Sequence, residues 1–82
     1  MWYVHFLQLS NRDIYVGSTG DLRTRLAMHE TGRVTSTKAL RPVILKSYVA
    51  VKTADHAREL ERYFKSGSGK AVAVKRLVRE DQ

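Results

Sequence analysis

Two short apolar runs at the start of the chain, separated by only four residues, limit the fold more than any other feature. WYVHFLQL (residues 2–9) and IYVGS (14–18) suit strands, and the intervening SNRD is rich in turn-forming residues. The spacing predicts an antiparallel hairpin. Tyrosine fits a strand well but glycine does not, so YVG at 15–17 is not what packing alone would select.

Helical spacing follows the hairpin. Residues 22, 25, 26 and 29 recur at the intervals of one helix face, and this helix should end near Gly32. Residues 33–42 are expected to form a polar, basic connection, and VILKSYVAV (43–51) a third strand. Thr53 is a suitable N-cap for a second helix that runs to about Lys65.

The four residues SGSG (66–69) should break the second helix. The segment after them, KAVAVKRLV (70–78), is either a last helix or a short strand, because the β-branched Val72 and Val74 oppose helix formation. We favour the helix. The expected fold is α+β, a small three-stranded sheet flanked by helices in the order β-β-α-β-α-α. We expect one domain over 1–79 and a short tail over 80–82.

Composition excludes several classes of protein. With 82 residues, 43% of them apolar and 28% charged, the chain suits one ordinary globular domain. The absence of cysteine rules out disulfides and thiolate zinc sites and agrees with a reducing cytoplasm, the location we expect. The N-terminal apolar run is too short to span a bilayer and has no basic leader, so we interpret it as a strand.

Charge points to a polyanionic partner. The chain carries a net charge of +7 and has a pI near 10.2. From residue 62 to residue 79 the chain has no acid and six basic residues: Arg62, Lys65, Lys70, Lys75, Arg76 and Arg79. Such an excess attracts phosphate backbones, although a basic surface kept only for solubility has the same composition. No basic amphipathic helix with large apolar anchors suggests a membrane.

Polar residues stand on the apolar stripes of both helices. Arg25 and His29 share a stripe with leucines, and Glu61 aligns with Ala57, Leu60 and Phe64. An internal Arg25–Glu61 ion pair, or side chains that reach water from the stripe edge, would explain them. On the strands, alternation places His5 with Tyr3 and Leu7, and Tyr15 with Gly17.

If these faces meet, one cluster holds a carboxylate, an imidazole, a phenol and a guanidinium. That set suits phosphodiester cleavage: a carboxylate holds a divalent cation, a phenol or imidazole moves a proton, and a guanidinium stabilises charge on phosphate. The register that would bring His5 beside Tyr15 cannot be read from the sequence.

The ordered segments YVHFL, IYVGST-GDLRTRLAMHETG, STKALRPVIL and ARELERYFKSGSG resemble the GIY-YIG nuclease superfamily over residues 2 to about 79. The likeness is greatest to small single-domain bacterial members. The resemblance implies that Tyr15 is a general base or orients water, that Arg25 stabilises the phosphate, that His29 assists, and that Glu61 ligates a single Mg²⁺ or Mn²⁺ ion.

The chain departs from the family pattern at two positions. His5 replaces the tyrosine that usually ends the first motif, and it can still accept or relay a proton. The late asparagine of some members has no counterpart, since Asn11 lies in the expected turn. Glu59 competes with Glu61 for the acidic role, but it points about 200° away around the helix, to solvent.

We therefore expect a metal-dependent endonuclease that acts on DNA, at branched or damaged structures in repair or recombination, with RNA not excluded. Two other functions stay open: a module on the same fold that binds nucleic acid without cutting it, and a basic scaffold. The chain leaves room for a homodimer or a partner protein that supplies specificity. The expected phosphate contacts are Arg33, Lys38, Arg41, Lys65, Lys70, Lys75 and Arg76.

Overall fold

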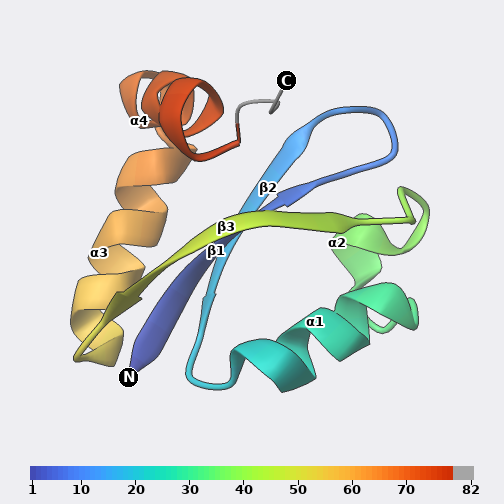
Figure 1. Cartoon of the computed structure of the whole chain (residues 1–82), viewed down its shortest axis with the longest axis horizontal. Coiled ribbons are helices and arrows are strands. Elements are labelled where there is room, and N and C mark those ends of the chain that lie inside the picture. The colour runs from blue at the N-terminus through green and yellow to red at the C-terminus, as the bar shows by residue number, and fades with distance from the viewer. Residues whose placement is uncertain (79–82) are drawn as a thin grey trace.

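Three antiparallel strands form the centre of the molecule, and helices cover both faces of the sheet (Figure 1). The structure is a computed structural model, and it describes residues 1–78. The expected α+β class and the order β-β-α-β-α-α are confirmed. The expected tail over 80–82, and the last residue of the expected domain, lie outside the described residues.

The central strand of the sheet is the first in the chain. β1 (Trp2–Gln8) pairs antiparallel with β2 (Ile14–Thr19) on one side and with β3 (Ile44–Val51) on the other. In the hairpin turn the side chain of Asn11 accepts a hydrogen bond from the backbone N–H of Asp13 at 2.9 Å. The register of the hairpin sets His5 opposite Gly17, with Tyr48 opposite it on β3.

Alternation along β1 separates an apolar core from a polar cluster. Val4 and Phe6 are fully buried against Ala57 and Phe64 of α3 (Ala54–Lys65), and the two phenylalanine rings meet edge to face at 5.0 Å. His5 points to the other face, where its ring contacts His29 of α1 (Leu22–Glu30). One face of the sheet therefore holds the hydrophobic core, and the other holds titratable side chains.

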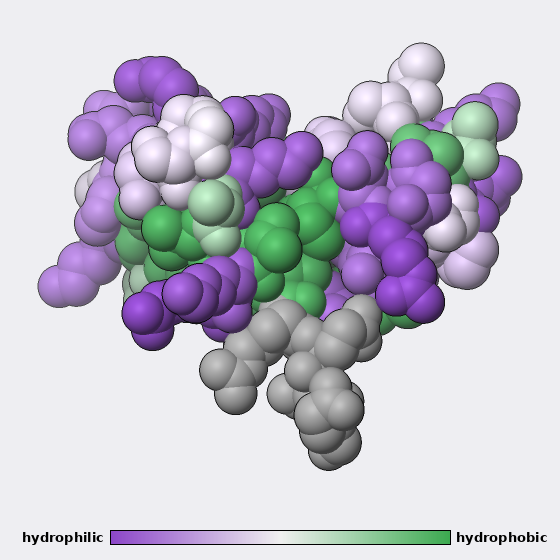
Figure 2. Space-filling view, turned by 90° about the horizontal axis from the view of Figure 1, so that it is seen from above, coloured by the Kyte–Doolittle hydropathy of each residue, from purple (hydrophilic) through white to green (hydrophobic). Residues whose placement is uncertain are grey.

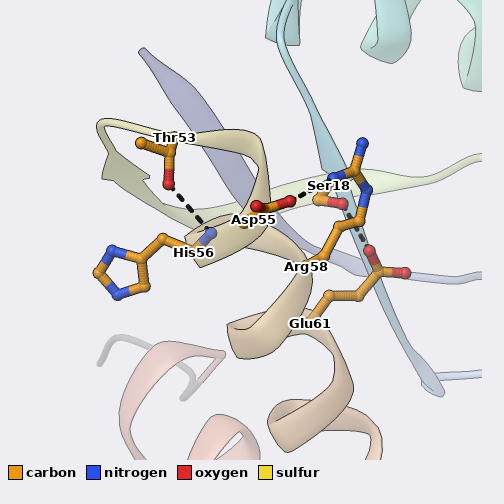
Figure 3. A network of polar contacts seen from close by, with 6 residues as sticks. All are labelled: Ser18, Thr53, Asp55, His56, Arg58 and Glu61. Carbon is orange, nitrogen blue, oxygen red and sulfur yellow. Dashed lines mark hydrogen bonds and ion pairs between the residues drawn. The ribbon is translucent and has the colours of Figure 1, made fainter.

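Side chains at their N-termini fix where the two long helices begin. Thr53 caps α3, as expected, by accepting a hydrogen bond from the backbone N–H of His56 at 3.1 Å (Figure 3). Asp21 caps α1 by accepting from the backbone N–H of Thr24 at 3.1 Å. These bonds satisfy backbone donors that a helix start leaves free, and so they set the orientation of the site residues further along each helix.

The expected polar, basic connection over 33–42 includes a helix that the sequence did not predict. It contains a short helix, α2 (Thr35–Lys38), with Thr37 fully buried. A single turn of helix offers too few positions for a periodic pattern, and the sequence therefore gave no sign of it.

The C-terminal segment is helical, so the helix is confirmed over the strand alternative. SGSG ends α3 but does not form a loop: Ser66 caps α4 (Gly67–Val72), which continues into the π-helical turn η1 (Ala73–Leu77). Gly69 packs so closely on α3 that a Cβ atom there would overlap the carbonyl oxygen of Tyr63. None of the helices described within residues 1–78 is both long enough and apolar enough to cross a bilayer.

Candidate active site

Three rings from three elements meet between the sheet and α1. His5 of β1 stacks near Tyr15 of β2, with ring centroids 6.4 Å apart. His29 of α1 meets both rings edge-on, at 5.9 Å from His5 and 5.1 Å from Tyr15. The hairpin register and the position of His29 on the inner stripe of α1 thus bring together three residues predicted from the sequence.

The close approach of His5 explains the glycine in YVG. A Cβ atom on Gly17 would lie 2.6 Å from His5 Nε2, well inside van der Waals contact. Gly17 therefore allows the imidazole to lie flat across the neighbouring strand. Both His5 and His29 are fully buried, and neither nitrogen of His5 has a hydrogen-bond partner among the described residues.

Thr37 of α2 holds the ring of His29. Its hydroxyl lies 2.8 Å from His29 Nδ1, and Nε2 of the same ring is buried without a partner among the described residues. The contact fixes the orientation of the ring and leaves one nitrogen free within the cluster. Sequence reasoning missed Thr37, although it belongs to the STK of the segment STKALRPVIL.

Burial keeps both histidines uncharged at neutral pH. Burial is the main cause that lowers the pKa of His5 to about 4, and the neighbouring His29 and the positive charge of Arg25 lower it further. The pKa of His29 is lowered by burial and then by Arg25. Glu61 and Lys65 also act on the pKa of His5, with opposite signs. A neutral imidazole can accept a proton, so either histidine can act as a general base or as a proton relay.

The side chain of Glu61, on α3, reaches β2, which is an edge strand of the sheet. Its Oε1 accepts a hydrogen bond from Ser18 Oγ at 2.5 Å, and the two side chains point toward one another in Figure 3. Its Oε2 accepts from Lys65 Nζ at 2.8 Å. Burial alone would raise the pKa of Glu61, but the hydrogen bonds from Lys65 and Ser18 outweigh it, so the net shift is downward. The carboxylate is therefore ionised at neutral pH.

The hydrogen-bond partners of Glu61 are not those that one interpretation of the sequence predicted. An Arg25–Glu61 ion pair is not formed; Lys65 and Ser18 satisfy the carboxylate instead. Arg25 is half-buried, and its guanidinium makes no hydrogen bond or ion pair with any residue in the described part of the chain. Its five donors are thus available to an anionic group near the histidines, whose pKa values its charge lowers.

The donor chemistry at Glu61 fits a hard divalent cation. The carboxylate is ionised and one-quarter exposed. Within residues 1–78, no three His, Cys, Asp or Glu side chains gather into a site that could enclose an ion. Mg²⁺ does not need such a cage, because it keeps several waters and binds through one or two carboxylates. Lys65 would compete with an ion for the same oxygen.

All seven basic residues predicted to bind nucleic acid are exposed. They fall into two groups, one around α2 and one from the end of α3 to η1, on opposite sides of the molecule (Figure 1). Hydrophilic side chains cover both sides in the view of Figure 2, with an apolar hollow between them. Arg41 is partly used within the fold, since it donates to the carbonyl oxygens of Lys38 and Glu30.

A scan against protein-family models matches the GIY-YIG catalytic domain over residues 1–75. The chain belongs to the GIY-YIG family. Searches of curated proteins and of solved structures found no significant match. GIY-YIG domains are nucleases, so nuclease chemistry and a nucleic-acid substrate follow for this chain at the level of the family. The resemblance seen in the motifs is thereby confirmed.

Ser18 is the second site residue that sequence reasoning did not assign to this GIY-YIG domain. Ser18 lies 43 residues from Glu61 in the chain, and the packing of α3 against β2 brings the two side chains together. Nothing local in IYVGST distinguishes a serine that supports a carboxylate from one exposed on an edge strand.

Proposed function

We propose that this GIY-YIG domain is a divalent-metal-dependent endonuclease that hydrolyses phosphodiester bonds in DNA. One observation supports the proposal most: the rings of His5, Tyr15 and His29 meet on one face of the sheet, within the electrostatic field of Arg25 and Glu61. Those five side chains are the ones assigned to catalysis from the motifs.

Each residue has a role that its surroundings support. Tyr15 and the two neutral histidines form a group that accepts a proton from the attacking water and passes it on. Thr37 keeps His29 oriented by the 2.8 Å contact with its Nδ1. Arg25, whose guanidinium donors have no partner within residues 1–78, binds the phosphate and stabilises the charge that develops on it.

Glu61 would hold a Mg²⁺ or Mn²⁺ ion, with Ser18 fixing the carboxylate from the opposite side. A bound ion would neutralise charge on the phosphate as a Lewis acid. Lys65 holds the carboxylate ionised through its hydrogen bond. Selectivity for branched or damaged DNA, a role in repair or recombination, and a cytoplasmic location complete the proposal, the last because the chain contains no cysteine.

A cleavage assay tests the proposal. Labelled duplex, single-stranded, flap and four-way-junction DNA would be incubated at low salt with Mg²⁺, Mn²⁺ or EDTA. We expect cleavage in the presence of either metal and none in EDTA, with the preferred structure revealed by the relative rates. Equal cleavage in EDTA would contradict metal dependence, and cleavage of RNA in preference to every DNA would contradict the substrate.

The second candidate is a module that binds nucleic acid without hydrolysing it. His5 favours it: an imidazole with a pKa of about 4 and no hydrogen-bond partner within residues 1–78 stands where the family usually has a tyrosine. Binding without metal-dependent turnover, both in the wild type and in His5→Tyr, would support this function over the nuclease.

A further inference from the structure

A second site lies beside the ring cluster, in a hollow of about 440 Å³ at the start of α1. That volume falls in the range of small-molecule binding sites. Tyrosine rings line one side and leucines of α1 the other, with the polar residues at its edge. The lining includes Tyr3, Asp21, Leu22, Arg23, Leu26 and Tyr48. None of the tyrosines here has a role in the proposed catalysis.

The aromatic side of the hollow is a pair of tyrosine rings, one of them half-buried and the other exposed. Tyr3 of β1 and Tyr48 of β3 meet edge to face, with centroids 5.9 Å apart. Tyr48 is 53% exposed, so its ring is accessible to a ligand. Such a pair offers a preformed surface on which a planar group can stack.

The polar edge of the hollow favours nucleic acid over an apolar partner. Arg23 is exposed and forms no hydrogen bond or ion pair with other described residues, so its guanidinium is available to a phosphate. Asp21 is occupied as the cap of α1 through both carboxylate oxygens. The net charge of +7 adds a general attraction for a polyanion.

The hollow adjoins the candidate active site. Tyr3 precedes His5 by two residues on the same face of β1, which separates their Cα atoms by about 7 Å at the usual rise of a strand. Tyr3 also pairs with Thr19, the neighbour of the Ser18 that supports Glu61. If the phosphate to be cleaved lies at the candidate active site, a neighbouring nucleotide of the same strand therefore lies beside this hollow.

We propose that this hollow receives one unstacked base of the nucleic-acid substrate, held by stacking on Tyr48 while Arg23 contacts the adjoining phosphate. The inference rests on the proposed function, since it extends the same substrate. A base stacked inside a duplex cannot enter the hollow, so it selects single-stranded or distorted nucleic acid. Stacking accepts any base, which supplies structural selectivity without sequence specificity.

Binding measured without catalysis tests the inference. Fluorescence anisotropy in EDTA at low salt would compare a single-stranded oligonucleotide with one of equal length whose sugars all lack bases. We expect the wild type to prefer the base-carrying strand roughly 5- to 150-fold, the range for stacking of one base on an aromatic side chain. Tyr48→Leu should lose this preference, and Tyr48→Trp should keep it.

Tyr63→Leu is the matched control, because Tyr63 is exposed to a similar degree, 46%, but lies on α3 away from the hollow. The same loss in Tyr63→Leu, a preference unchanged in Tyr48→Leu, or no binding to either strand would overturn the inference. So would self-association of the wild type that Tyr48→Leu abolishes, since a second copy would then occupy the hollow.

The two proposals can fail separately. A base preference that depends on Tyr48, with no cleavage in Mg²⁺ or Mn²⁺, would support the hollow and reject the nuclease. Metal-dependent cleavage with no base preference would reject only the hollow.

Discussion

The buried imidazole of His5 makes the stability of this domain sensitive to acid. The pKa of His5 falls from an ordinary 6.5 to about 4 in the folded chain, mainly through burial. Between these two pH values the unfolded chain binds the proton more tightly, so the free energy of unfolding should decrease as pH falls from 6.5 to 4. The decrease attributable to one such group is on the order of 3 kcal/mol, and the group has no effect above about pH 7.

Denaturant unfolding at several pH values between 4 and 7 would measure this effect. His5→Leu should remove most of the slope in this window, whereas His56→Leu, at an exposed position of α3, should leave it in place. His29 contributes in the same direction, because its pKa is lowered too. An unchanged slope in His5→Leu would show that His5 does not titrate as its burial requires.

Lys65 should weaken the binding of a divalent cation at Glu61. Its ammonium occupies Oε2 at 2.8 Å, so an ion has to displace it. Half-exposed ion pairs of this kind contribute about 0.2–1 kcal/mol, and we expect Lys65→Met to raise Mn²⁺ affinity roughly two- to fivefold. Calorimetric titration with Mn²⁺ would measure it. Lys70→Met, which removes an equal charge from α4, should change the affinity less, and weaker binding in Lys65→Met would refute the competition.

The junction of α3 and α4 depends on one glycine. A Cβ atom at Gly69 would overlap the carbonyl oxygen of Tyr63, a backbone atom that cannot move without shifting α3. Gly69→Ala should therefore destabilise the domain by about 2 kcal/mol or more. A Cβ atom at Gly67 would meet no other part of residues 1–78 within 4 Å, apart from its chain neighbours and its own helix backbone, so Gly67→Ala should be neutral or stabilise by up to about 1 kcal/mol.

Thermal and denaturant unfolding of the two alanine variants would compare them directly. Because the substitution is the same and both positions lie in one short helix, helix propensity cannot explain a difference between them. Equal stability of the two variants would contradict the packing at this junction.

The elements that the sequence predicted are those with repeated local signals. The stripe of Ala57, Leu60 and Phe64, with Thr53 as the cap, defined α3 to within a residue. The sequence did not predict α2, because a single helical turn is too short to show a periodic pattern. The contribution of α2 to the site is one buried contact, between Thr37 and His29. The SGSG segment suggested an interruption between helices, because glycine disfavours helix formation. In the structure, the last of its glycines lies within a helix, where close packing on α3 leaves no room for a side chain.

The candidate site was predictable from the sequence only through its motifs. Stripe positions placed His29 and Glu61 on inner helix faces, but the meeting of His5 with Tyr15 depends on a strand register that no local pattern sets. Glu61 has two hydrogen-bond partners, Lys65 one helical turn away and Ser18 on a distant strand. No local pattern in the sequence indicates a long-range contact such as the one with Ser18.

At the scale of the whole molecule, the basic surface should make nucleic-acid binding strongly dependent on salt. Each phosphate neutralised by a lysine or arginine adds about 0.9 to the slope of log K against log salt on duplex DNA, and about 0.7 on single strands. Lys75→Ala, in the exposed basic run, should reduce the slope by roughly the amount that one phosphate contact contributes. Lys52→Ala, between β3 and α3 and outside both basic groups, should not. Equal reductions would show that the attraction is spread over the whole surface.

We propose that Glu61 holds a divalent ion in the active site of this nuclease, and two glutamine variants on α3 test that role. Glu61→Gln removes the charge of the carboxylate and keeps its shape; Glu59→Gln makes the same change two residues earlier, on an exposed face of α3. We would measure the rate of Mg²⁺-dependent DNA cleavage for both. We expect a loss of at least about tenfold in Glu61→Gln and a wild-type rate in Glu59→Gln. A loss below tenfold in Glu61→Gln, or an equal loss in Glu59→Gln, would contradict it.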